Sequence, residues 1–251
     1  MPTLVRETEK QRHTWLDALR GLALLNMIAY HASWDIVYLL GVDWPWFSSL
    51  GAHLWQQAIC RTFILLSGFC WCFSRRWLYH GVKVFVCGLL VTAVTVIAMP
   101  DSVVWWGVLT FLGAAGILTG VLRPLLQKCP PALGLAGSIA LFTLTKSVEW
   151  GGLAGHPLPE WLYEAGHLGA FFGFPPHDFF STDYFPLLPW IFWYLAGYFL
   201  FFLWEPYRER FPLGGQEIPV LGWLGRHSLP AYLVHQPAVY AALMVGAKLL
   251  L

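Results

Sequence analysis

Residues 15–40 read WLDALRGLALLNMIAYHASWDIVYLL, a hydrophobic stretch long enough to cross a bilayer as a helix. It carries four ionisable side chains, Asp17, Arg20, His31 and Asp35. At about 100° per residue, the eleven steps from Arg20 return His31 to within roughly 20° of it. Asp17 and Asp35 lie one turn beyond the two ends of this pair, so all four share one stripe. Ionisable groups at membrane depth face a bundle interior or a wet cavity, which makes this stripe the candidate working site.

The whole chain has the composition of a polytopic membrane protein. Of its 251 residues, 57% are hydrophobic and 12% are charged, and apolar runs of about 20 residues recur. We predict an all-α fold, a polytopic transmembrane helical bundle of about seven spans that forms a single domain over residues 1–251. The spans are expected at 15–40, 54–74, 82–99, 103–122, 131–145, 184–204 and 229–250. The net charge of +1 says nothing about nucleic acid, but the sequence has no basic stripe and no zinc-finger spacing, so no nucleic-acid partner is expected.

The basic residues predict an orientation with the N-terminus in the cytoplasm. The residues that then fall on the inner side are Arg6, Lys10, Arg12, Arg75, Arg76, Lys83, Arg123, Lys128, Arg208, Arg210 and Arg226. This bias is the one that the positive-inside rule requires. The polar start of the chain precedes a segment too long for a signal peptide, so the first helix is expected to be retained.

A long outer connection over residues 146–183 interrupts the pattern of spans. It is rich in Gly, Pro and aromatic residues, and such long loops are usually functional or disordered. Aromatic side chains beside carboxylates suit a lid that binds a sugar or another polyol. They suit an interfacial aromatic belt equally, and both interpretations remain open.

Depth along the helices suggests a partner for the stripe. With hydrocarbon beginning near Leu22, His31 lies about 14 Å inward, close to the middle of the bilayer. Asp35 on the first span and Arg61 on the second both lie about 10 Å from the outer boundary. A buried arginine without a partner is costly, so we predict an Arg61–Asp35 pair beside His31. The alternative is that Arg61 snorkels outward to water.

The chemistry of the stripe centres on His31. A neutral imidazole can accept a proton from an amine or hydroxyl, or can itself be acylated. A structural histidine that is hydrogen-bonded between helices is the alternative. Inner arginines, namely Arg20, Arg75, Arg76 and Arg226, can receive a phosphorylated cofactor or can simply reflect topology. The five cysteines have no zinc-ligand spacing, so no metal site is predicted.

Four motifs resemble one family. They are LDALRGLA at 16–23 followed by Met27 and His31, FILLSGF at 63–69, DYFPLLPW at 183–190, and GRHSL at 225–229 followed by Tyr232, Leu233 and HQP at 235–237. Together they resemble membrane proteins with the heparan-alpha-glucosaminide N-acetyltransferase catalytic domain, and above all their small bacterial members. The spacing of Arg20 and His31 is also similar to that in the transmembrane acyltransferases of acyltransferase family 3.

The resemblance implies a membrane-bound acyltransferase in the bacterial cytoplasmic (inner) membrane, with the lipid bilayer as its surroundings. It would move an acyl (acetyl) group from cytoplasmic acetyl-CoA or another acyl-CoA to an amine or hydroxyl of a saccharide or envelope acceptor. The expected catalytic residues are His31, Asp35, Arg61, Arg20 and Asp17. The expected acyl-CoA-binding residues are Arg75, Arg76, Arg226, His227, Ser228, His235 and Gln236.

Two other classes of function remain open. A small-molecule transporter or binding protein could use the polar stripe and a helix broken at Pro237 as a midplane site. A structural protein could use the stripe to hold helices together.

Overall fold

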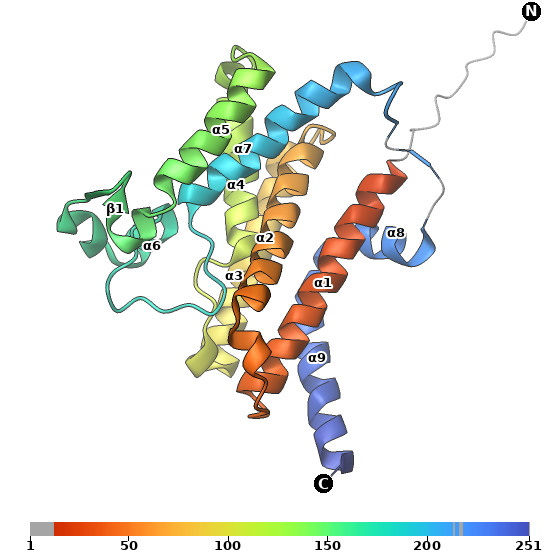
Figure 1. Cartoon of the computed structure of the whole chain (residues 1–251), viewed down its shortest axis with the longest axis vertical. Helices are drawn as coiled ribbons and strands as arrows, with labels where there is room; N and C mark the ends of the chain where they lie inside the picture. The colour runs from red at the N-terminus through yellow and green to blue at the C-terminus, as the bar shows by residue number, and fades with distance from the viewer. Residues whose placement is uncertain (1–12, 213, 216–217, 251) are drawn as a thin grey trace, which may run out of the picture. The chain divides into compact units, whose positions relative to one another are not determined.

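The computed structural model describes residues 13–212, 214–215 and 218–250, and the side chains up to residue 246. Its elements are α1 (Thr14–Tyr38), η1 (Pro45–Ser48), α2 (Leu50–Trp71), α3 (Trp77–Ala98), η2 (Pro100–Ser102), α4 (Val108–Leu126), α5 (Pro131–Thr145), η3 (Val148–Trp150), β1 (Gly152–Leu153), β2 (His156–Pro157), η4 (Glu160–Glu164), α6 (Gly166–Phe172), α7 (Leu187–Trp204), η5 (Glu205–Tyr207), α8 (Pro219–Arg226) and α9 (Ser228–Leu250). The predicted all-α membrane fold is confirmed (Figure 1).

Four segments of the described chain are long and apolar enough to cross a membrane. They are Trp77–Ala98, Val108–Leu126, Pro131–Trp150 and Leu187–Tyr207, and they correspond to the third to sixth predicted spans. The first, second and seventh predicted spans are also helical: they correspond to α1, α2 and α9, which have 25, 22 and 23 residues. That these three helices cross the bilayer, and that the N-terminus lies in the cytoplasm, remain predictions. Arg6, Lys10 and Arg12 lie outside the described residues.

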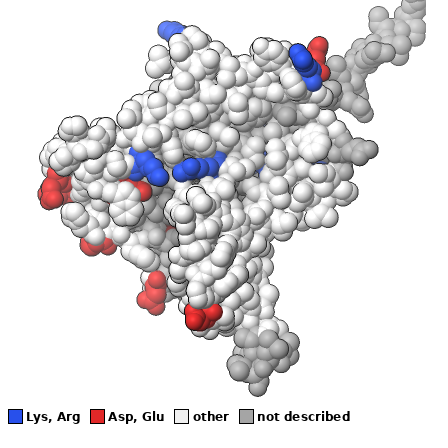
Figure 2. Space-filling model, in the orientation of Figure 1, with Lys and Arg blue, Asp and Glu red and all other residues white. Residues whose placement is uncertain are grey.

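The outer surface of α3 shows why the protein needs a lipid environment. Val94 and Ile97 are 60% and 83% exposed, and further apolar side chains of α3 are exposed beside them. Figure 2 shows a face with few charged side chains among a large uncharged area. Apolar surface of this extent is unfavourable in water and favourable against hydrocarbon.

Two compact units make up the chain, and each is described by itself. The first contains Met1–Ile59 and Pro206–Leu251, and the second contains Cys60–Glu205. The prediction of a single domain over the whole chain therefore stays a prediction.

In the first unit, α1 packs against α8 and α9. Its core is a hydrophobic cluster of Leu24, Met27 and Ile59, against which Tyr232 of α9 is partly buried. Helices α1 and α9 run in the same direction (Figure 1), as the first and seventh spans of the predicted bundle would. This direction lets successive residues of the two helices meet at matching levels.

In the second unit, α3 packs on α4, and α7 packs on α5 and α4. Helix α7 also approaches the second half of α2 through glycines. A Cβ atom at Gly68 would overlap the carbonyl oxygen of Tyr194, and one at Gly197 would overlap that of Leu65. Small residues of this kind let helix backbones approach closely in membrane proteins.

Helix α4 begins at Val108, five residues later than its predicted span. The intervening backbone pairs with the end of the outer connection instead, since Thr182 N donates to Val103 O and Phe185 N to Trp106 O. The carboxylate of Asp183 then accepts the Val108 N–H at 3.1 Å, which satisfies a backbone donor at the start of the helix. These tertiary contacts delay the helix.

Candidate functional site

Helix α1 buries most of the polar stripe. Asp35 is fully buried, and Leu24 and Met27, which lie on the same helix face between Arg20 and His31, belong to the core of the first unit. Arg20 and His31 are half-buried. The helical periodicity therefore predicted correctly that the stripe turns inward.

Asp35 is held by Gln236 of α9. The Nε2 atom of Gln236 donates to Oδ1 of Asp35 at 2.8 Å and lies 3.1 Å from Oδ2. These contacts offset part of the cost of burying a carboxyl group. The Oε1 atom of Gln236 is buried and has no hydrogen-bond partner among the described residues. It can therefore accept a hydrogen bond from an N–H or O–H group that enters the site.

A second histidine lies beside His31. The rings of His31 and His235 are 5.0 Å apart between centroids and inclined by 58°. His235 is 8% exposed, and its Nδ1 contacts the carbonyl oxygen of Tyr232. Because a carbonyl oxygen can only accept, Nδ1 carries the hydrogen, and the neutral ring of His235 has its lone pair on Nε2. The pair therefore offers two imidazoles suited to proton transfer.

The start of α1 is joined to α8 by Arg20. Its Nη1 atom donates to Asp17 Oδ1 at 3.2 Å and to the carbonyl oxygen of Gly225 at 3.4 Å. A Cβ atom at Gly21 would overlap the carbonyl of Leu221, and one at Gly225 would overlap that of Asp17. The two helices thus meet backbone to backbone beside the Asp17–Arg20 pair.

The other predicted residues of the first unit lie at the junction of α8 and α9. Arg226 is half-buried at the end of α8, and Ser228 is half-buried at the start of α9. His227, between the helices, is exposed, and its Nδ1 lies 2.9 Å from the carbonyl oxygen of Trp223. Its ring stacks on that of Trp223 at 4.7 Å.

Arg61, Arg75 and Arg76 belong to the second unit. The guanidinium carbon of Arg61 lies 5.8 and 5.9 Å from the ring centroids of Phe142 and Trp193, in cation–π range. Trp193 Nε1 also donates to the backbone carbonyl of Arg61 at 2.8 Å. Arg61 lies in the second unit and Asp35 in the first, and each unit is described by itself. The Arg61–Asp35 pair therefore remains a prediction.

Arg75 and Arg76 are exposed in the turn between α2 and α3. Two cationic side chains in sequence at an exposed turn are accessible to an anionic ligand. In the part of the chain that the structure describes, no three His, Cys, Asp or Glu side chains are grouped to hold a metal ion.

Two polar contacts between α1 and α9 were not predicted from the sequence. The structure places His235 beside His31 and Gln236 beside Asp35, and the predicted role of His235 and Gln236 in acyl-CoA binding stays a prediction. From the sequence, membrane depths are compared for residues on the first and second spans only. The same estimate of depth for the last span, which begins near Ser228, could have indicated that His235 and Gln236 lie near the level of His31 and Asp35.

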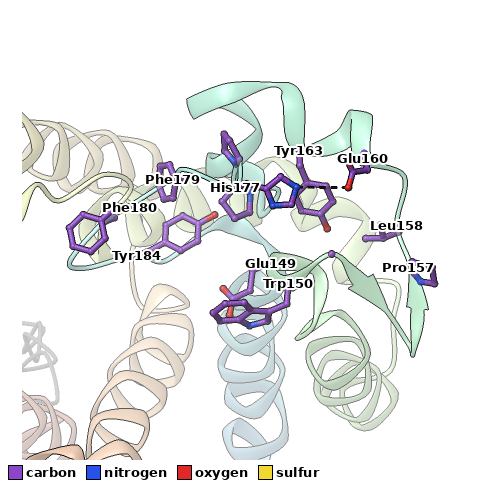
Figure 3. A pocket seen from close by; sticks show the side chains of 14 residues that line it. Glu149, Trp150, Pro157, Leu158, Glu160, Tyr163, His177, Phe179, Phe180 and Tyr184 are labelled. Atoms are coloured by element: carbon purple, nitrogen blue, oxygen red, sulfur yellow. Dashed lines mark ion pairs between the residues drawn. The ribbon is translucent and has the colours of Figure 1, made fainter.

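The outer connection is ordered and encloses a cavity. Its strands β1 and β2 pair in an antiparallel hairpin, with Gly152 opposite Pro157 and Leu153 opposite His156. The two-residue turn has positive φ at both Ala154 and Gly155, as tight hairpins require. Beside this hairpin lies a cavity of about 590 Å³ (Figure 3).

The family comparison agrees with the motifs. Residues 12–237 match the sequence profile of the family described as heparan-alpha-glucosaminide N-acetyltransferase, catalytic. The match spans the candidate site from Asp17 to Gln236. No curated protein and no solved structure matches the chain.

Proposed function

Because the chain belongs to the heparan-alpha-glucosaminide N-acetyltransferase catalytic domain family, we propose that it is a membrane-bound acyltransferase that uses acyl-CoA, with acetyl-CoA as the first candidate. The acceptor is an amine or hydroxyl of a saccharide or another envelope molecule, and the membrane is the bacterial cytoplasmic membrane. The observation that carries the proposal is the cluster of His31, His235, Asp35 and Gln236 between α1 and α9.

Arginines are suited to hold the phosphates of the donor. A guanidinium binds phosphate by paired, charge-assisted hydrogen bonds. Arg75 and Arg76 are exposed in the second unit. In the first unit, Arg20 donates to the carbonyl of Gly225, which directly precedes Arg226. The thioester supplies an activated acyl carbonyl.

His31 acts as the general base. It takes a proton from the acceptor amine or hydroxyl while the nitrogen or oxygen bonds to the acyl carbon. The carbon–sulfur bond breaks, and the proton passes to the departing sulfur to give the thiol. His235 supplies a second imidazole that can hold the proton between these transfers. Gln236, fixed by Asp35, offers Oε1 to an N–H or O–H of the acceptor.

Binding and turnover of acetyl-CoA by the purified protein test this proposal. We expect calorimetry to detect CoA binding, and we expect slow hydrolysis of acetyl-CoA when no acceptor is present. His31→Gln should lower the turnover by about 10²- to 10⁴-fold, the usual contribution of a general base, while CoA still binds. His53→Gln, at an exposed position of α2, is the matched control. If the protein binds no CoA at millimolar concentration, the proposal is wrong.

A further inference from the structure

The cavity in the outer connection has its own chemistry. At about 590 Å³ it falls in the range of small-molecule sites. Its wall comes from three segments, 149–151, 157–163 and 175–184, the last of which ends one residue beyond the outer connection. Figure 3 shows Glu149 and Trp150 on one side, Glu160 and Tyr163 on another, and Tyr184 on a third.

Aromatic rings supply much of the wall. They belong to Trp150, Tyr163, Phe179, Phe180 and Tyr184. The hydroxyls of Tyr163 and Tyr184 donate to the backbone carbonyls of Val148 and Ala170, and this orients both rings. The ring of Phe179 packs 4.9 Å from that of Tyr184. Tyr163, Phe179 and Tyr184 therefore present fixed aromatic surface to the cavity.

The charge of the wall is negative. Glu149 and Glu160 line it, and among the described residues no lysine or arginine does. Lys146 does not line the cavity but interacts electrostatically with Glu149. His177 does line it, and its Nε2 lies 3.9 Å from Glu160 Oε1. Both of these side chains are more than four-fifths exposed, at 88% and 86%, so solvent screens the pair. The carboxylate of Glu160 therefore remains available to a positive ligand, and Glu149 adds a second carboxylate to the wall.

We propose that this cavity binds the ammonium group of an organic amine. Aromatic rings attract a cation through their quadrupole, and carboxylates add direct attraction and hydrogen-bond acceptors. Acyl-CoA carries several phosphates and no ammonium group, so the same carboxylates repel it and the donor binds elsewhere. A neutral polyol gains neither charge interaction. This inference goes beyond acyl transfer, since the binding needs neither CoA nor His31.

The amine can come from two sources. One is a soluble amine, and the other is the ammonium of a phospholipid headgroup. Trp150 and Phe180 line the cavity and are 83% and 63% exposed. Exposed aromatic side chains next to membrane-spanning segments are typical of the headgroup region. Both sources present the same chemistry to the cavity.

Calorimetry with benzylamine and benzyl alcohol on the purified full-length chain in detergent tests the charge. At pH 7 the two probes differ in the ammonium group, and we expect benzylamine to bind about tenfold more tightly. Glu160→Gln should weaken benzylamine binding by about fivefold, because it removes one carboxylate. Glu164→Gln is the matched control, since Glu164 is exposed on the same η4 helix and does not line the cavity.

Nanodiscs distinguish the two sources. Weaker benzylamine binding in discs with phosphatidylethanolamine than in discs of phosphatidylglycerol alone identifies the lipid headgroup, and equal binding identifies a soluble amine. The proposal is overturned if benzyl alcohol binds as tightly as benzylamine, or if Glu160→Gln and Glu164→Gln bind benzylamine equally. All titrations omit CoA, so a failure to bind benzylamine leaves the acyltransferase proposal unaffected. A failure to bind CoA likewise leaves the amine-binding proposal unaffected.

Discussion

The side-chain amide of Gln236 contacts both carboxylate oxygens of Asp35, at 2.8 and 3.1 Å, across a separation of 201 residues. Asp35 is fully buried in α1, and Gln236 is in the last helix. The contact therefore joins the two ends of the chain at the candidate site, next to the His31–His235 pair.

Gln236→Leu should destabilise the protein by about 1.5–3 kcal/mol, because a buried carboxyl group then loses its hydrogen-bond donor. Thermal unfolding in detergent, followed by circular dichroism, measures the effect. The double variant Asp35→Leu/Gln236→Leu should recover part of the loss, since replacing both partners leaves no unsatisfied group. A double variant that is less stable than Gln236→Leu would contradict the pairing.

Gly225→Ala should destabilise the contact of α1 with α8. The added Cβ would overlap the carbonyl of Asp17, so the helices must separate, at a cost of about 1–3 kcal/mol. Gly246→Ala, also at a helical position, is the control because a Cβ added there would meet no heavy atom within 4 Å apart from its chain neighbours and the backbone of its own helix. The midpoints of thermal unfolding compare the two. Equal midpoints would show that α1 and α8 are not in backbone contact.

The double variant Arg75→Ala/Arg76→Ala should weaken CoA binding by about tenfold while folding is unchanged, since both side chains are exposed. The remaining binding should depend less on salt, because fewer ion pairs with phosphate are left to screen. Arg123→Ala, at an exposed position of α4, is the control. Titration calorimetry at two salt concentrations provides the measurement. If the double variant and the control bind CoA equally, these arginines only set the topology.

Asp183→Ala should cost about 1 kcal/mol, the usual effect of removing a helix N-terminal acceptor. Asp183 accepts the Val108 N–H at the start of α4. Asp183→Asn keeps an oxygen acceptor and should retain most of the stability. Hydrogen exchange of the amides at the start of α4 reports the change directly. Unaltered exchange in Asp183→Ala would mean that another group satisfies this helix end.

The sequence by itself determined the class of fold and the inward-facing stripe. Helical periodicity and hydropathy are local properties, so the apolar segments that became α3, α4, α5 and α7 were predictable. The same periodicity placed Asp35 and Leu24 on one buried face. The four motifs also indicated the family that the profile match identifies.

Only the tertiary structure decided which side chains meet. The pairs His31–His235 and Asp35–Gln236 form because α9 packs against α1, and no local pattern encodes which helices pack together. This packing follows from contacts far apart in sequence, such as the approach of Gly225 to Asp17. The first segment therefore specified its own polar stripe, while its partners on α9 came from the packing of the two ends of the chain.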